Sequence, residues 1–492
     1  MRPALSFWKR PSAVVTALLA LGWFALAGAG YPPPNVDDIC YAGPAIEVAN
    51  GHGPMDPWGP YYVEHTEGRA TYPPFYAYLL GGWLKVFGVS SPSMLFFYAL
   101  CGMALTLAIG FFVRRWRLAW WVEVLMTAFI VVCFASKGLR PDLCGMAMFA
   151  VGAALEAGEG RWRKGWGTAL VVASVFTLPS IAAWAGPFLF YRFGERALAA
   201  GIPAACREML PRLAAIGAAL GLLFLWSVGF ELRKFLAYAH ANALYSVSMY
   251  GTIYFDNWTH SLGLFIRMAL LTLLSYGVGA VFWAGVWQRT QGVERQRLWL
   301  GTAAAAAVSV MLFRMLSVSS TGLQLLNLTS ALVLPVFLAV GWLRGRKVLL
   351  AVALPAVLAV CVLLPVSYWQ FLTWAASPAV DKGRAREIKQ EVDALAPALV
   401  WVDGYAARYV YDYRLPAELR DFSHDRESYG RWVKASQEEK AARKADTVWI
   451  LCAGTIPYAE GLENDRRPRP LRFFGRRFPR GIANEGELFL IR

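Results

Sequence analysis

The chain of 492 residues is 57% hydrophobic and only 16% charged, and its formal net charge is +15. A soluble protein averages about 25% charged residues. The shortfall comes from long apolar runs separated by short charged links, which argues against a soluble globular protein and indicates a polytopic helical membrane protein. Much of the positive excess sits in those short links, as the positive-inside rule describes, and no nucleic-acid-binding motif accompanies it. We therefore expect no nucleic-acid partner.

The first apolar run, Ala13 to Gly30, follows the basic residues Arg2, Lys9 and Arg10. A basic start, an apolar core and small residues at the end are also features of a secretory signal. Because the chain continues with many further apolar runs, we favour a retained membrane span. The basic residues predict a cytoplasmic N-terminus, so the loop that follows, residues 31–74, would face outside.

This outer loop is acidic, with six carboxylates against one arginine. Two of the carboxylates, Asp37 and Asp38, are adjacent and come directly after the first span, where the head group of a lipid would react. One of them could take a proton from a hydroxyl nucleophile, or the pair could hold a divalent cation. The alternative is a solvated acidic loop without a chemical role.

Ten more apolar runs are predicted to cross the membrane, which makes about eleven spans with the C-terminus outside. The segment 75–87 is too short to span and is expected at the interface as a helix. Links rich in Arg or Lys are expected inside, among them 192–212, and a long outer loop is expected over 231–258. The predicted runs are 94–113, 119–135, 143–155, 166–177, 181–191, 213–230, 262–287, 298–316, 323–343 and 348–366.

The composition changes from about Tyr368, where polar and basic residues replace the apolar runs. Residues 398–403 (ALVWVD), 447–452 (TVWILC) and the terminal ELFLIR read as buried strands. We therefore predict an all-α polytopic membrane domain over residues 1–367 and a small extracytoplasmic α/β domain over 368–492.

A second polar group lies in the link between the third and fourth spans. Lys137, Arg140 and Asp142 would face the same compartment as Asp37. Two cations and one carboxylate suit an anionic phosphate together with a hydroxyl or cation partner. The alternative is a structural ion pair that caps the two helices.

Two further features are weaker on their own. Tyr72, Pro73 and Pro74 could shape a sugar-binding rim, although a rigid turn into the interfacial helix is the simpler interpretation. The histidines are scattered, so no metal-ligand spacing is present, but His240 in the long outer loop could reach the site.

Taken in order, these elements resemble the C-type (GT-C) superfamily of glycosyltransferases, and most closely its bacterial branch of aminoarabinose and mannosyl transferases. The matching elements occur in the family's order and spacing over residues 1–160, whereas residues 200–492 match only by topology. They are Asp37-Asp38 after the first span, a helix ending in Ala49-Asn50-Gly51-His52-Gly53, Tyr72-Pro73-Pro74-Phe75-Tyr76 before an aromatic helix ending in Phe87-Gly88, and Arg140-Pro141-Asp142.

The resemblance implies an integral membrane enzyme that moves a sugar from a polyprenyl-phosphate donor to a lipid, glycan or protein acceptor, with inversion. Asp37 would be the catalytic base, and Asp38 would orient either the acceptor or Asp37. Lys137 and Arg140 would hold the phosphate leaving group, and Asp142 would position either Arg140 or a substrate hydroxyl. The reaction would take place on the outer face of the bacterial inner membrane, with no certain cofactor and with a divalent cation at Asp37 and Asp38 left open.

Two other function classes remain as alternatives. A transporter or flippase of lipid-linked sugars would be expected to show internal repeats and ionisable residues in the middle of the membrane. The sequence shows no convincing repeat, and its acidic residues concentrate at the outer surface. A non-catalytic assembly or sensor protein is the third class, against which the adjacent carboxylates count.

Overall fold

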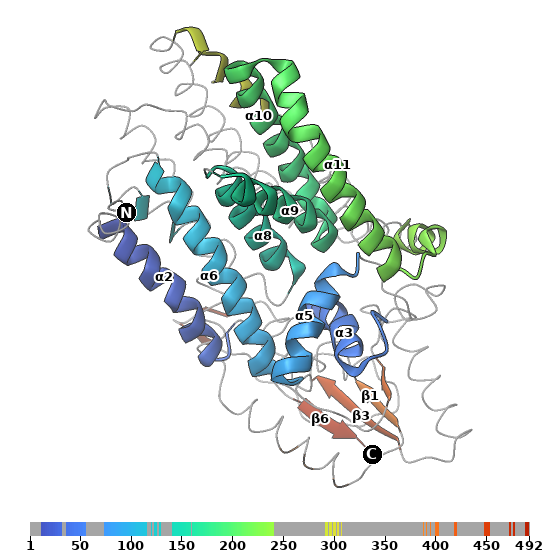
Figure 1. Cartoon of the computed structure of the whole chain (residues 1–492). Helices are drawn as coiled ribbons and strands as arrows, with labels where there is room; N and C mark the ends of the chain where they lie inside the picture. Colours follow the sequence, from blue (N-terminus) through green and yellow to red (C-terminus); the bar gives the residue numbers. More distant parts are fainter. Residues whose placement is uncertain are drawn as a thin grey trace.

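The structure is a computed structural model, and it describes residues 11–31, 36–55, 73–115, 140–158 and 160–240, with shorter stretches at 120–128, 291–307 and 387–394 and strands between 399 and 491. The described part is mostly helical (Figure 1). Its longer helices are α2 (Pro11–Gly28), α3 (Val36–Asn50), α5 (Phe75–Phe87), α6 (Ser91–Arg115), α8 (Pro141–Glu156), α9 (Arg161–Thr177), α10 (Ala182–Ala200) and α11 (Ile202–Ser227), with a 3-10 turn at η1 (Pro179–Ile181).

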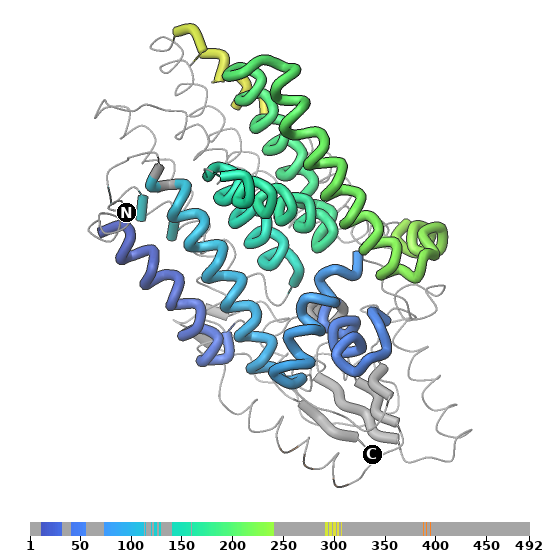
Figure 2. The backbone as a smooth tube through the Cα atoms, viewed as in Figure 1, coloured from blue at the N-terminus to red at the C-terminus, as the bar shows by residue number. Residues whose placement is uncertain are grey.

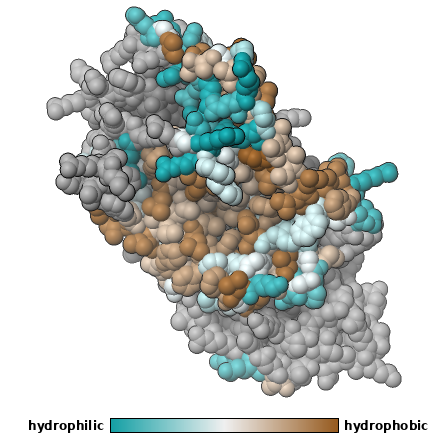
Figure 3. Space-filling view, in the orientation of Figure 1, coloured by the Kyte–Doolittle hydropathy of each residue, from teal (hydrophilic) through white to brown (hydrophobic). Residues whose placement is uncertain are grey.

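Three of the described helices are long and apolar enough to cross a membrane. They are α2, the Ser91–Phe112 portion of α6, and α11. Figure 3 shows hydrophobic residues covering the middle of the visible face, whereas hydrophilic residues gather toward the turn between α10 and α11. The chain is therefore a membrane protein by the length and composition of its helices.

The described helices form a bundle with two distinct ends. Figure 2 shows α3 and α5 at one end and the turn between α10 and α11, at Gly201, at the other. We call the first the α3 end. The second, which also carries the last residue of α8, we call the Glu156 end.

The link over 192–212 is not a loop as predicted, because α10 continues to Ala200 and α11 begins at Ile202, and its location on the inner side stays a prediction. Only Gly201, with a φ of +85°, separates the two helices. Alanine, leucine, arginine and glutamate are strong helix formers, so a charged link of this composition extends the helices instead of interrupting them. The first part of the predicted outer loop 231–258 is also helical, over residues 232–240.

Helices α2 and α6 are joined through a buried tryptophan. The indole nitrogen of Trp23 donates to the Thr106 hydroxyl at 2.9 Å, and the Trp23 side chain is almost fully buried. A Cβ atom at Gly102 would lie 2.3 Å from the Trp23 ring. The missing side chain at Gly102 is therefore the space into which the indole packs.

Helices α8 and α9 approach each other closely at a pair of glycines. A Cβ atom at Gly152 would lie 2.8 Å from the carbonyl oxygen of Gly167. A Cβ atom at Gly167 would lie 2.7 Å from the carbonyl oxygen of Gly152. Small residues on both faces allow two backbones to pack at a distance that larger side chains would prevent.

Helices α3 and α5 pack in the same manner. A Cβ atom at Gly81 in α5 would lie 2.6 Å from Val48 and 2.7 Å from the Ala45 carbonyl oxygen in α3. The bounds of α5 confirm the helix predicted over 75–87, and α3 ends at Asn50 before Gly51, whose φ is +92°. This pairing holds the helix that carries Asp37 and Asp38 against the helix that follows Pro74.

The C-terminal part contains strands β1 (Leu399–Val402), β2 (Glu418–Arg420), β3 (Thr447–Cys452), β4 (Arg472–Phe473), β5 (Arg476–Arg477) and β6 (Leu488–Ile491). Four of them form a sheet in the order β2-β1-β3-β6, in which β1 runs parallel to β2 and β3, and β6 runs antiparallel to β3. Strands β1, β3 and β6 lie where strands were predicted. A separate domain over 368–492 stays a prediction, since most of that range lies outside the described residues.

Candidate functional site

The paired carboxylates lie at the start of a helix. Helix α3 begins at Val36, which places Asp37 and Asp38 in its first turn. Acidic residues are favoured there because the exposed backbone N–H groups and the helix dipole attract negative charge. The side chains of Asp37 and Asp38 lie outside the described part of the structure, so their roles stay predictions.

The second polar group lies at the start of another helix. Arg140 is the residue before α8, Pro141 is its first residue, and Asp142 lies in its first turn. Proline suits this position because its missing N–H would have no partner in the helix. The guanidinium Nε of Arg140 donates to the Asp142 carboxylate at 3.0 Å, and the two side chains are only 13% and 5% exposed. A short, nearly buried ion pair therefore fixes the direction of the arginine.

A contact joins the second polar group to α3, the helix whose first turn contains Asp37 and Asp38. The guanidinium carbon of Arg140 lies 5.7 Å from the centre of the Tyr41 ring, within the range of a cation–π interaction. Tyr41 follows Asp37 by four residues on the same helix, so the two lie about one turn apart on neighbouring positions of one face. Sequence reasoning predicted that the two groups face the same compartment, but it missed Tyr41 as a contact of Arg140, since nothing in its sequence context marks it.

One other hydroxyl near this region is unsuited to act as a base. Tyr31, the first residue of the outer loop, is 4% exposed, and its burial raises the pKa of its hydroxyl to about 12. Desolvation disfavours the phenolate, so Tyr31 is neutral at physiological pH.

The other predicted site residues have different outcomes. Lys137 and Tyr72 lie outside the described residues. Pro73 and Pro74 directly precede α5, and Pro74 is its buried N-terminal neighbour, which fits the rigid turn as well as the sugar-binding rim. His240 is exposed and is the last described residue of the helical stretch 232–240, so its role at the site stays a prediction.

No metal site is visible among the residues that the structure describes. No group of three or more His, Cys, Asp or Glu side chains is arranged to hold an ion there. The described part does not include the side chains of Asp37 and Asp38, and a divalent cation at that pair therefore stays an open prediction.

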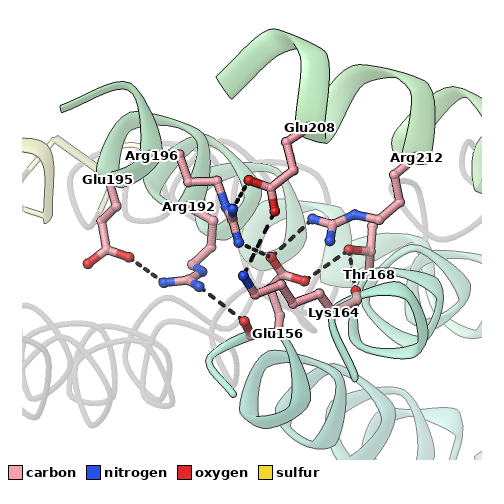
Figure 4. A network of polar contacts seen from close by, with 8 residues as sticks. All are labelled: Glu156, Lys164, Thr168, Arg192, Glu195, Arg196, Glu208 and Arg212. Carbon is pink, nitrogen blue, oxygen red and sulfur yellow. Dashed lines mark hydrogen bonds and ion pairs between the residues drawn. The ribbon is translucent and has the colours of Figure 1, made fainter. Parts of the chain in front are cut away.

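The largest polar cluster in the described bundle was not predicted as a unit. Figure 4 shows eight side chains from α8, α9, α10 and α11 meeting at the Glu156 end. At its centre, Glu156 is fully buried. Its carboxylate accepts from the Thr168 hydroxyl at 3.1 Å and from Arg212 at 3.1 Å, and Arg196 lies 3.9 Å away.

The outer part of the same cluster pairs the remaining charges. Arg192 donates to the backbone carbonyl of Glu156 at 3.0 Å and also binds Glu195. Glu208 binds Arg196 and lies 3.8 Å from Lys164. All three carboxylates in the cluster are engaged by cations, so none is a good candidate for a base. We interpret the Glu156 cluster as a structural link between four helices.

The sequence contained a signal for this cluster, although not its centre. Arg192 and Arg196 are four residues apart, as are Glu208 and Arg212, so each pair lies on one helical face. That periodicity becomes informative only if 192–212 is helical, and the prediction of a loop concealed it.

No family model matches the chain, and no curated protein is significantly similar to it in sequence. The function must therefore be argued from the residues and their geometry.

Proposed function

We propose that the chain is an integral membrane glycosyltransferase that transfers a sugar from a polyprenyl-phosphate donor to a cell-envelope acceptor. The observation that supports this most is the contact of Arg140 with Tyr41. It places the guanidinium group of Arg140 against Tyr41, which follows Asp37 by one turn of the same helix. A transferase of this kind needs both a base for the acceptor hydroxyl and a cation for the phosphate leaving group.

In the proposed reaction, the Asp37 carboxylate takes the proton of the acceptor hydroxyl. The oxygen then attacks the anomeric carbon of the sugar, and the bond from that carbon to the phosphate oxygen breaks. The leaving polyprenyl phosphate gains negative charge, which Arg140 and Lys137 would stabilise. Asp142 would hold Arg140 in position, and Asp38 would orient the acceptor. The configuration of the sugar inverts because a single displacement occurs.

The membrane arrangement is part of the proposal. We propose about eleven spans, with the N-terminus in the cytoplasm, the α3 end at the outer face of a bacterial inner membrane, and residues 368–492 as an extracytoplasmic α/β domain. A lipid donor would enter sideways between helices. The position of Arg140 at the start of a helix next to α3 agrees with a reaction at the membrane surface.

The proposal is tested by mass analysis of envelope lipids and glycans from cells with and without the protein. We expect one sugar to be missing from one acceptor when the protein is absent. Expression of the normal chain should restore it, and expression of Asp37→Asn at the same membrane level should not, because an amide cannot accept the proton. Full restoration by Asp37→Asn would disprove the assignment of the base.

A second arm separates transfer from transport. The purified chain in detergent micelles is mixed with the accumulated lipid-linked sugar and the unmodified acceptor. A transferase forms the product there, whereas a flippase has no second compartment to act on. Absence of product with the normal chain, together with restoration in cells, would favour the flippase.

A further inference from the structure

Exposed cations and indoles gather at the start of α9. Arg161 and Arg163 are exposed, and Trp162 and Trp166 are 82% and 66% exposed. Neither arginine forms an ion pair or hydrogen bond with any described residue, in contrast to the arginines of the neighbouring Glu156 cluster. We call these four residues the Arg161 patch.

The helix geometry arranges the patch as one surface. Trp162 and Trp166 are four residues apart and therefore share a face. Arg161 and Arg163 lie on either side of Trp162, each about 100° around the helix axis. Two indole rings are thus flanked by two guanidinium groups. Both indoles are exposed on the surface of the described bundle.

The positive charge in the first turn of α9 has no acidic partner on the same helix. The first turn of α9 contains no acidic residue, and its preceding residue, Gly160, provides no side-chain cap. Cations at a helix N-terminus are disfavoured by the helix dipole. A negative partner from outside the protein would remove that cost and would also complement the two arginines.

The position of the patch identifies which partner fits. It lies at the Glu156 end, where α9 begins next to the end of α8, and three helices of this bundle are long and apolar enough to cross a membrane. Tryptophan is favoured at the level of lipid head groups because its ring is amphipathic. Arginine is attracted to anionic lipids at that depth. A soluble protein partner would not explain the indoles and cations together at this level.

We propose that the Arg161 patch binds anionic phospholipids of the membrane leaflet at the Glu156 end. The phosphodiester oxygens accept hydrogen bonds from Arg161 and Arg163, and the two indoles pack beside the glycerol and upper acyl region. The patch thereby holds the start of α9, and with it the Glu156 cluster, at a fixed depth. This surface is separate from the α3 end and does not depend on the proposed transferase activity.

The experiment uses the full chain in phosphatidylcholine vesicles that contain a small fraction of spin-labelled lipid. The motionally restricted fraction is measured once with labelled phosphatidylglycerol and once with labelled phosphatidylcholine. The normal chain should restrict phosphatidylglycerol preferentially. In Arg161→Gln/Arg163→Gln, that preference should fall by about fivefold, because each cation near a lipid surface contributes appreciably to the attraction.

A matched control removes two exposed cations at another place, in Lys85→Gln/Arg233→Gln. This variant should retain the preference if the effect is local to the patch. An equal fall in both variants would indicate general net charge and would overturn the proposal. If the glutamine variant does not fold, the proposal is tested in two other ways. These are the lipid preference of Arg161→Lys/Arg163→Lys and the effect of salt on the preference of the normal chain.

The lysine variant should keep most of the preference, and raising the salt concentration should weaken it in the normal chain, since exposed charges are screened. A preference that is insensitive to salt would overturn the proposal. Inorganic phosphate at millimolar concentration is the last probe. Complete displacement of labelled phosphatidylglycerol by phosphate would show that the site takes a free anion instead of a lipid.

Discussion

Arg140 is held from two sides by residues of two different helices. Asp142, on its own helix, accepts a hydrogen bond from its Nε atom, and the Tyr41 ring of α3 lies beneath its guanidinium group. The Asp142 carboxylate fixes the direction of the guanidinium group, and the Tyr41 ring offers it a flat face with partial negative charge. Together they orient the arginine more than either contact alone would.

This arrangement leads to a prediction for Tyr41 that depends on the proposed transferase function. In Tyr41→Leu, we expect kcat/KM for transfer to fall by about threefold to tenfold, since a cation–π contact of this kind contributes about 0.5–1 kcal/mol or slightly more. Tyr41→Phe keeps the ring and should stay close to the normal rate. Steady-state kinetics with the lipid-linked donor measures both.

The same pair of variants shows when the interpretation is wrong. If Phe impairs transfer as strongly as Leu, the ring is not what positions Arg140, and the tyrosine hydroxyl has another role. If both variants are fully active, Tyr41 does not act through Arg140 at all. Inactivity of the normal chain would instead count against the proposed function.

Glu156 is the residue on which stability should depend most at the opposite end. It is the fully buried carboxylate to which Arg212 and Arg196 point. In Glu156→Gln, the shape is kept but the buried cations lose their central counter-charge. We expect a loss of about 3 kcal/mol or more, as is typical when one partner of a buried ion pair is removed.

Thermal unfolding of the purified chain in detergent measures this loss. Glu208→Gln serves as the matched control, because Glu208 belongs to the same cluster but its side chain is 46% exposed. Its effect should be much smaller, since solvent screens an exposed pair. Equal effects of the two substitutions would mean that burial of Glu156 is not what makes it important.

At the scale of elements, the pairing of α8 with α9 depends on two residues without side chains. Gly152 and Gly167 allow the two backbones to meet, and the Glu156 cluster lies one turn beyond that contact. Close packing and the ion network therefore support the same helix pair. The network would not reach its partners if the helices were held further apart.

Gly152→Ala is the substitution that tests this contact. Alanine ordinarily stabilises a helix relative to glycine by about 1 kcal/mol. At Gly152 the new Cβ atom would lie 2.8 Å from a backbone oxygen, so we expect a net destabilisation of about 1–3 kcal/mol from overpacking. Thermal unfolding of the purified chain shows directly whether Gly152→Ala lowers or raises the stability.

Gly186→Ala in α10 is the control for helix propensity, because a Cβ atom there has no neighbour within 4 Å. It should leave the unfolding temperature unchanged or raise it. A stabilised Gly152→Ala variant would show that α8 and α9 are not in such close contact.

At the scale of the whole molecule, the two ends of the bundle should lie on opposite sides of the membrane. His52 lies at the α3 end and Ala200 at the Glu156 end, and both are exposed. We expect His52→Cys to react with a membrane-impermeant maleimide on intact cells, and Ala200→Cys to react only after permeabilisation. The unsubstituted chain measures the background from its native cysteines.

Reaction of both cysteines on intact cells would contradict a membrane-crossing bundle. The reverse pattern would keep the bundle but place the α3 end in the cytoplasm. That result would also move Asp37, Asp38 and Arg140 away from the face on which the proposed reaction occurs.

Several elements were predictable because they depend on local chemistry. The apolar run at α2, the helix over 75–87 and the hydrophobic strands β1 and β3 follow from composition and periodicity over short windows. The start of α8 was also marked in the sequence, by a proline with an acidic residue in the first turn. None of these required knowledge of a distant partner.

The errors have one physical origin. The link 192–212 was assigned to a loop because it is charged, and charge was taken to mean solvent. In the structure most of its charges are paired, several of them with residues of α8 and α9, so the segment remains helical and partly buried. Whether a charged helix is stable depends on its partners, and these are distant in the sequence.

The sequence by itself determined that this is a helical membrane protein, that an acidic pair follows its first span, and that Arg140 and Asp142 stand together at a helix start. Those features depend on hydrophobicity, charge and spacing within one segment. Only the tertiary structure decided that Arg140 lies over Tyr41 of α3, and that Glu156 gathers cations from α10 and α11 and a hydroxyl from α9. Such contacts depend on the distance between the backbones of packed helices. That distance is determined by the glycines and the side-chain shapes on both packed faces.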